Sequence, residues 1–427
     1  MEKKVELRRV LGLWEVTLSG VGIILGAGIY ALIGEAAGLA GNAVWIAFAL
    51  SALVAMVTGL SYAELSSMFP KASAEYEYTY QAFGRRLAFV IGWLIIFSGV
   101  IGAATVALGF AGYLNALFGA SRIPSALILV VILSGIIFVG IKQSAWIAII
   151  FTLIEALGLI IIIILGIPYL GSVNYLEMPL GIRGIFQASA LIFFAFIGFE
   201  EIVKLSEEAR EPEKIIPKAL ILAIGSSIVL YVLVAISAVS VLGWQDLSRS
   251  SAPFADIANA AFGRNAFFAL SIMALFATTN TVLLMLLAAS RIIYGMADSS
   301  SLPEALGKVH PITRTPWVAI LACMIFCMGF VLLEDIALVA NINNFTVFVT
   351  FIAINAALIF LRYKRPEAPR PFRVPLVAGK LPFLPLLGII LNSFMLIQLT
   401  PDVIAIGIGL TAIGILVALA IDRYRSP

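Results

Sequence analysis

The sequence predicts an all-α membrane protein with twelve transmembrane helices and no sizeable soluble domain. Its 427 residues are 62% hydrophobic and only 12% charged, whereas soluble domains are about 45–50% apolar and about 25% charged. With so few charged and polar residues, a soluble protein of this size could not cover its surface with polar groups. Long apolar windows, and the alternation of basic residues between them, are the other two observations that favour this class.

Apolar windows define the expected helices. A transmembrane helix needs about 20 predominantly apolar residues, and the chain contains twelve such windows. The connections are short, and only 244–265 and 362–382 are long enough for ordered loop structure, so we expect one membrane domain over 1–427. The predicted spans are 14–38, 42–66, 87–117, 124–141, 144–168, 184–204, 217–243, 266–297, 317–333, 337–361, 383–399 and 402–421.

The basic residues orient these spans. If the N-terminus is cytoplasmic, segments on that side hold 23 of the 27 Lys and Arg residues, and the outer segments hold 4. Cytoplasmic loops of membrane proteins carry an excess of Lys and Arg. We therefore expect both termini in the cytoplasm. The same count supports twelve spans, because a missed or extra helix would destroy the alternation.

Two spans contain glycines that interrupt a helix. The first has Gly20, Gly22, Gly26 and Gly28, and the sixth has Gly198 followed by two carboxylates. Glycine costs about 1 kcal/mol in a helix interior, and unwound backbone at membrane depth is tolerated only where it is buried or lines a water-filled cavity. Close helix packing through small residues is the alternative interpretation.

The interruptions recur at matching positions. Gly26 and Gly198 are 172 positions apart, and the third and eighth spans begin 179 positions apart. Two halves that each open with an interrupted helix indicate an inverted repeat. We place the first repeat at about 14–168 and the second at about 184–361, with helices 11 and 12 at about 383–421. In such folds the broken helices meet near the midplane and form the substrate site.

Several modest motifs occur in order along the chain. They are Gly26-Ala-Gly-Ile-Tyr, the segment from Tyr62 to Ala72, the block from Phe193 to Pro217, the run from Ser290 to Asp298 with Leu302-Pro, the loop from Gly307 to Trp317, and Arg370-Pro-Phe-Arg-Val-Pro. Together they resemble the amino acid–polyamine–organocation permeases. The resemblance implies the leucine-transporter-type fold, with five plus five inverted helices, two appended helices and transport by alternating access.

The resemblance also implies a substrate site at the two breaks. Backbone N–H groups of the first break would hold the substrate carboxylate, and carbonyls of both breaks would hold its ammonium group. Phe196 and Phe199 flank the second break and are candidates for a gate or a side-chain pocket. The candidate donors are Gly26, Ala27 and Gly28, and the candidate carbonyls lie at or near Ile23, Ile24, Phe194 and Ile197.

Ionisable residues inside spans are functional candidates by default. Glu155 lies within the fifth span, and Glu200 follows the break in the sixth. Many proton-coupled members of the family have a lysine at the position where we place Glu155. Because a glutamate has the opposite charge, the coupling mechanism of that lysine cannot be assigned to this chain. We expect Glu155 or Glu200 to carry a proton. The alternatives are a sodium ligand or a neutral hydrogen-bonded acid at Glu155, and a structural cap at Glu200.

The eighth span contains a polar cluster that lines the path or ties helices together. Its members are Thr278, Thr279, Asn280 and Thr281.

The predicted function is secondary active import of small or neutral amino acids across the plasma membrane, coupled to protons. An amino acid/amine exchanger and cationic amino acid uptake remain alternatives. The repeated filter segments expected of a channel are not visible. One histidine, two cysteines in an apolar run, and no HExxH, G-x-S-x-G or Walker A motif argue against an enzyme or metal site. We expect no cofactor, no nucleic acid and no obligatory protein partner, only the amino acid and the lipid bilayer.

Overall fold

The protein is a bundle of long apolar helices. The computed structural model describes residues 9–71, 74–140, 145–298 and 301–425. Apolar segments form helices in a membrane because each backbone polar group must be satisfied within its own segment. The longer helices are α1 (Leu13–Ile24), α2 (Gly28–Ala40), α3 (Val44–Met68), α5 (Arg85–Phe118), α6 (Arg122–Val139), α7 (Ala145–Gly166), α8 (Gly181–Ile192), α9 (Pro212–Arg249), α11 (Arg264–Asp298), α12 (Trp317–Val331), α13 (Ile336–Lys364), α14 (Phe383–Ile397) and α15 (Pro401–Arg425).

Short elements connect these helices. α10 (Pro253–Phe262) and the antiparallel pair β1 (Val377–Ala378) and β2 (Leu381–Pro382) lie in the two segments predicted to hold ordered loop structure. α4 (Ala74–Phe83) lies between two predicted spans, where no helix is predicted. The 3-10 segments are η1 (Gly41–Ala43), η2 (Ile167–Tyr169), η3 (Phe193–Phe196), η4 (Phe199–Glu207) and η5 (Glu304–Gly307).

Many of the helices are suited to a membrane. Within the described ranges, eight helical segments are long and apolar enough to cross a bilayer, and four shorter apolar helices accompany them. Each of the twelve predicted windows overlaps at least one of these segments. The protein is therefore an all-helical, multi-pass membrane protein.

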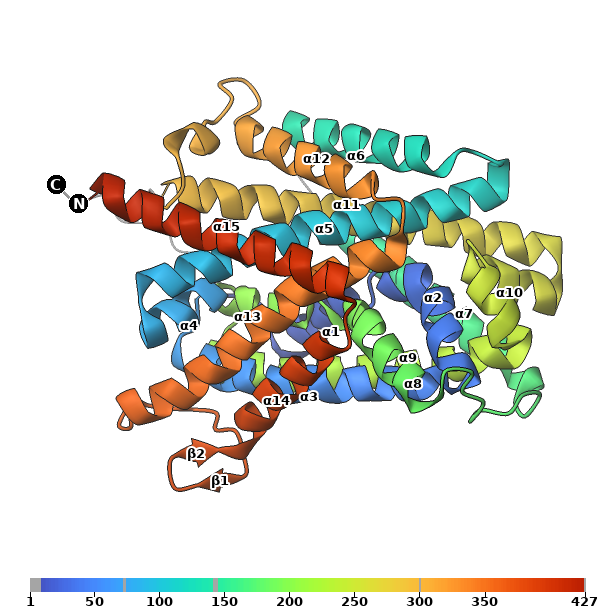
Figure 1. Ribbon diagram of the computed structural model, residues 1–427, viewed down its shortest axis with the longest axis horizontal. Coiled ribbons are helices and arrows are strands. Elements are labelled where there is room, and N and C mark those ends of the chain that lie inside the picture. Colours follow the sequence, from blue (N-terminus) through green and yellow to red (C-terminus); the bar gives the residue numbers. More distant parts are fainter. Residues whose placement is uncertain (1–8, 72–73, 141–144, 299–300, 426–427) are drawn as a thin grey trace.

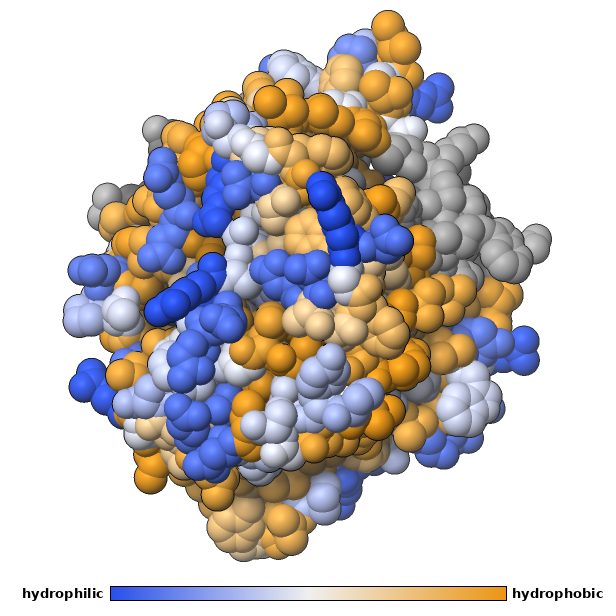
Figure 2. All heavy atoms as spheres, turned by 90° about the vertical axis from the view of Figure 1, so that its right-hand side faces the viewer, coloured by the Kyte–Doolittle hydropathy of each residue, from blue (hydrophilic) through white to orange (hydrophobic). Residues whose placement is uncertain are grey.

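The bundle has two distinct ends. Figure 1 shows α4 and the C-terminal end of α15 at one end and α10 at the opposite end. We name these the α4 end and the α10 end. Figure 2 views the α10 end, where hydrophilic side chains gather among largely hydrophobic surroundings. In the interior, α5 packs against α11 and α13, and α3 packs against α9.

Two expected helices are interrupted where the glycines predict it. The first window is divided between α1, which ends at Ile24, and α2, which begins at Gly28. The sixth is divided between η3 and η4 at Ile197 and Gly198, and the φ of Gly198 is 122°. Only glycine adopts this conformation readily, so the break in the sixth window depends on this residue.

A backbone bridge joins the start of α1 to the end of η4. Leu11 pairs with Ala209 in a parallel bridge. The N–H groups of Val10 and Leu11 donate to the carbonyl of Glu208 at 2.9 and 3.0 Å, and the Arg210 N–H donates to Leu11 at 3.0 Å. These bonds hold the α4-end halves of the two interrupted helices together.

A buried ion cluster fixes the loop after α13. Glu64, near the end of α3, is 0% exposed. Its carboxylate accepts hydrogen bonds from Arg362 Nε at 3.0 Å and from the Val374 N–H at 2.8 Å. Arg370 Nε lies 3.2 Å from the same carboxylate. A buried charge needs such partners, so this cluster holds α3, α13 and the loop after α13 in one arrangement.

Candidate functional site

The two breaks face each other in the core. A Cβ atom on Gly198 would lie 3.0 Å from the carbonyl oxygen of Ile23, and a Cβ on Gly28 would lie 2.9 Å from the Cα of Ala195. The distance at Gly198 is tighter than nine in ten real Cβ contacts, and the distance at Gly28 is shorter than real Cβ atoms essentially ever show. The missing side chains of these two glycines therefore allow the interrupted backbones to come into direct contact.

Tyr231 of α9 connects the two breaks. Its hydroxyl oxygen lies 2.6 Å from the carbonyl oxygen of Ile24 and 3.0 Å from that of Ala195. Carbonyls at a helix interruption lack their usual partners four residues on, and the shared hydroxyl donor supplies one. The side chain of Tyr231 is fully buried and packs edge-on against Phe196, with ring centroids 5.1 Å apart. Tyr231 thereby holds both breaks at a fixed separation.

The first break presents a free donor. The Ala27 N–H donates to Oγ1 of Thr281 on α11 at 3.2 Å, so this member of the polar cluster ties α11 to the break. The Gly28 N–H has no hydrogen-bond partner within the described ranges. α2 begins at Gly28, and the N-terminus of a helix carries a partial positive charge. An anionic group is stabilised at such a position.

The second break is capped by its own acid. The Gly198 N–H donates to Oε2 of Glu200 at 2.9 Å, and the Ile197 N–H donates to the Phe194 carbonyl at 3.3 Å. The Glu200 side chain is half-buried. Its carboxylate thus satisfies a backbone donor that the unwound segment would otherwise leave without a partner.

Two of the candidate phenylalanines lie on the side of the breaks that faces α2 and α9. Phe194 is 3% exposed, and its Cδ1 would lie 3.1 Å from a Cβ on Gly28. Phe196 is 1% exposed and contacts Tyr231. Both rings therefore pack directly beside the backbone that forms the breaks.

Phe199 belongs to a separate aromatic cluster between the second break and α4. Its ring centroid lies 5.2 Å from Phe351 and 5.7 Å from Tyr62, and Tyr62 in turn lies 6.2 Å from Tyr78 on α4. All four side chains are almost completely buried. This aromatic cluster fills the space on the α4 side of the site.

Glu155 is a buried carboxyl beside the first break. It is 2% exposed, and the Asn280 amide on α11 donates to its Oε1 at 3.4 Å. Its backbone carbonyl accepts from the Tyr30 hydroxyl of α2 at 2.7 Å. A Cβ on Gly158 would lie 2.1 Å from that hydroxyl, so the glycine makes room for this contact. The carboxyl therefore lies against α11. Its partner Asn280 directly precedes Thr281, the residue that bonds to the first break.

One face of α1 is exposed as far as the break. Ile23 is 37% exposed, although it contacts Gly198 in the core. Ser19 and Glu15, one and two turns earlier, are also exposed. Residues four apart lie on one face of a helix. A continuous accessible face therefore runs from the start of α1 to the interruption.

Tyr231 and Tyr30 were not among the site residues predicted from the sequence, although Tyr30 ends the motif Gly26-Ala-Gly-Ile-Tyr. Both are tyrosines inside apolar windows, where a buried hydroxyl needs a hydrogen-bond partner. That requirement is the signal that identifies them as candidates for bonds to broken backbone. Within the described part of the chain, no group of three or more His, Cys, Asp or Glu side chains is placed to hold a metal ion.

A bundle of apolar helices in which two interrupted helices meet in the core is the architecture of a multi-pass membrane transporter. The family model for amino acid permeases matches residues 11–420. The chain belongs to this family, which is part of the amino acid–polyamine–organocation permeases.

Curated relatives carry the names of transporters. The chain is 31% identical to the branched-chain amino acid permease BcaP of Bacillus subtilis over 418 residues, covering 92% of this chain and 88% of the relative. It is 30% identical to the methylthioribose transporter of Bacillus subtilis, covering 88% of this chain and 86% of the relative. It is also 30% identical to the human cationic amino acid transporter 4, with 86% of this chain and 62% of the relative covered.

Proposed function

We propose that this protein is a secondary active transporter that imports small or neutral amino acids across the plasma membrane by alternating access. The observation that carries the proposal is the contact between the two interrupted helices around Gly28 and Gly198. A free N–H at the start of α2 suits a carboxylate, and the neighbouring carbonyls suit an ammonium group. An amino acid has one of each.

The substrate carboxylate binds at the N–H groups of Gly26, Ala27 and Gly28. The ammonium group binds carbonyls at or near Ile23, Ile24, Phe194 and Ile197. The carbonyls of Ile24 and Phe194 already accept one hydrogen bond each, and a carbonyl oxygen has a second lone pair for another donor.

Apolar side chains favour a neutral substrate. Phe194, Phe196 and Ile197 surround the breaks, and apolar surface around a bound amino acid disfavours a charged side chain. The printed name of the branched-chain relative agrees with this preference. Cationic substrates remain the second candidate, because another relative is named a cationic amino acid transporter and because Glu200 lies at the second break. Exchange of an amino acid for an amine is the third.

In this proposal the chain crosses the membrane twelve times with both termini in the cytoplasm. α1 with α2 forms the first span and α8 with η3 and η4 the sixth, and the inverted repeats cover about 14–168 and 184–361, followed by helices 11 and 12 at about 383–421. The α4 end is then cytoplasmic. Basic residues concentrated in the segments assigned to that side support this orientation.

Protons drive uptake, and Glu155 is the favoured carrier. Its carboxyl is buried with one long hydrogen bond to Asn280, whereas Glu200 is engaged as a cap on Gly198. An intramembrane carboxyl of this kind is expensive to keep charged and marks a proton pathway. Sodium coordination by Glu155 is the alternative.

Uptake by purified protein in liposomes tests the proposal. Labelled L-leucine should accumulate on an inward pH gradient without sodium, and a competition screen with the standard amino acids and common polyamines defines the substrate. Equilibration without accumulation would instead indicate a channel. Accumulation on a sodium gradient alone would exclude proton coupling, and uptake that depends absolutely on internal substrate would indicate an exchanger.

A further inference from the structure

A polar cavity lies at the α10 end, away from the two breaks. Its volume is about 280 Å³, and residues of α2, α5, α6, α9 and α13 and of the turns before α10 and α13 line it. Two of these, Ala31 and Glu35, lie about one and two turns beyond Gly28 on α2. The cavity therefore lies further along the helix whose first residue belongs to the candidate substrate site.

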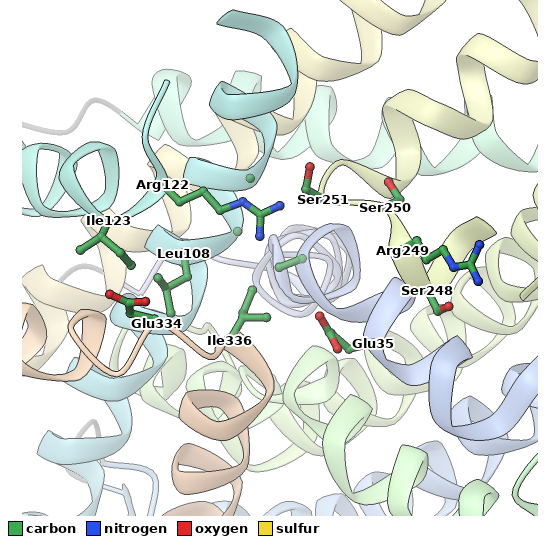
Figure 3. Close-up of a pocket in the computed structure, with 13 residues that line it drawn as sticks. Glu35, Leu108, Arg122, Ile123, Ser248, Arg249, Ser250, Ser251, Glu334 and Ile336 are labelled. Carbon is green, nitrogen blue, oxygen red and sulfur yellow. The ribbon is translucent and has the colours of Figure 1, made fainter. Parts of the chain in front are cut away.

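Charges of both signs line this cavity without pairing. The acids are Glu35 and Glu334 and the bases are Arg122 and Arg249. Within the described residues, no ion pair of 4.0 Å or less involves any of the four. Figure 3 shows the Arg122 guanidinium and the Glu35 carboxylate directed into the cavity from different helices, while the Arg249 side chain points away. A cation and an anion are thus held apart across an open space.

The backbone at the rim of the cavity is strained. Glu334, in the turn between α12 and α13, has a φ of 65°. A glutamate has a side chain that disfavours this left-handed conformation, and such strain persists only where surrounding structure requires it. Here the turn places a carboxylate at the cavity that already contains Arg122.

Besides these charged residues, the lining contains three serines, Ser248, Ser250 and Ser251, and an apolar part. Leu108, Ile123 and Ile336 provide apolar side chains. A Cβ on Gly109 would lie 2.7 Å from the Cβ of Ala31, so α5 lies directly against α2. Both residues of this contact belong to the cavity lining, and none of the residues of the two breaks does.

We propose that this cavity is an outer binding site that holds a free amino acid zwitterion before it enters the substrate site. Arg122 binds the carboxylate, Glu35 binds the ammonium group, and Leu108, Ile123 and Ile336 contact the side chain. A cavity of about 280 Å³ accommodates a small amino acid in place of several water molecules. This inference rests on the proposed function, because the α10 end faces the exterior only in the proposed orientation.

Equilibrium binding of labelled L-leucine to the detergent-purified full chain tests the inference without requiring transport. The wild-type protein should bind two molecules per chain, and the variants Arg122→Gln and Glu35→Gln should each bind one. Arg249→Gln is the matched control, because it removes the same charge from the same lining while its side chain points away from the cavity. The control should bind two.

Transport kinetics in liposomes supply the second readout. In oriented liposomes, Arg122→Gln should raise the KM for uptake from the outside several-fold while leaving the maximal rate and the KM for efflux unchanged. One leucine per wild-type chain, or equal changes in the Arg122 and Arg249 variants, overturns the outer site and leaves the proposed function intact. Two bound leucines without any transport would instead reject the proposed function and keep the outer site.

Discussion

The hydroxyl oxygen of Tyr231 lies 2.6 Å from the carbonyl oxygen of Ile24, although 207 positions separate the two residues. The same hydroxyl reaches the Ala195 carbonyl at 3.0 Å. One side chain of α9 therefore connects both interruptions, and the geometry of the candidate substrate site depends on a residue outside either break.

We expect Tyr231→Phe to reduce uptake strongly. The substitution keeps the aromatic ring but leaves two buried carbonyls without this donor, and an unsatisfied buried polar group costs about 1–3 kcal/mol. Thermal unfolding measures the loss of stability, and liposome uptake measures the loss of transport. Tyr175→Phe is the control. The Tyr175 hydroxyl accepts a hydrogen bond of 2.8 Å from the Gly171 N–H, and neither residue belongs to a break. Equal loss of uptake in both variants would contradict a specific role for Tyr231.

Gly28→Ala should abolish uptake. The new Cβ would lie 2.9 Å from the Cα of Ala195, so the two breaks must separate and the Gly28 N–H changes its position. Gly225→Ala on α9 is the control, because its Cβ meets nothing within 4 Å and alanine is favoured over glycine in a helix by about 1 kcal/mol. Normal uptake in the Gly28 variant would remove the first break from the substrate site.

Glu155→Gln should abolish accumulation driven by a pH gradient while preserving counterflow exchange. Glutamine keeps a similar shape and can still bond to Asn280, but it cannot carry a proton. In Glu200→Gln, the amide oxygen can still accept from the Gly198 N–H, so we expect driven accumulation to continue. If the two variants behave in the opposite way, Glu200 is the carrier.

A cysteine at position 19 should be accessible from the cytoplasm. Ser19 is exposed on the face of α1 that leads to the break. The native residues Cys323 and Cys327 are 1% and 0% exposed, so the background is low. We expect a membrane-impermeant maleimide to modify Ser19→Cys from the cytoplasmic side, and L-leucine to slow the reaction. The control Ser227→Cys, at a fully buried position, should not react. Labelling from the outside alone would reverse the proposed orientation.

Stability should fall as the pH rises through the titration of Glu75. This residue of α4 is 3% exposed, and burial raises its pKa above the usual 4.5 despite the opposing effect of Lys204. The folded protein then binds more protons than the unfolded chain between these two pKa values, so the free energy of unfolding decreases as pH increases through that window. Thermal unfolding of wild type and Glu75→Gln at several pH values measures this, and an identical pH dependence in both would contradict it.

The course of the chain follows directly from its hydropathy. The backbone polar groups of an apolar window of about 20 residues must bond within that window when it crosses a bilayer, which favours a helix. The helices of the structure accordingly overlap the predicted ranges. α4 was not predicted, because ten residues that include Glu75 and Glu77 are too short and too polar to resemble a span. Glycine positions also predict both interruptions, because only a residue without a Cβ tolerates the φ of Gly198.

The partners at the breaks were not predictable in the same way. Ala27 bonds to Thr281 across 254 positions, and a single sequence contains no signal for contacts between residues so far apart. The polar cluster on the eighth span therefore left two interpretations open. In the structure Thr281 ties helices together, and Asn280 binds the buried Glu155.

The bridge between Leu11 and Ala209 has a mechanical consequence. It joins the start of α1 to the end of η4, so a displacement of one half-helix is passed to the other through backbone hydrogen bonds. The two half-helices then share one degree of freedom. In the proposed orientation, opening toward the cytoplasm follows a single coordinate, and a pull applied near Val10 acts on both interruptions at once.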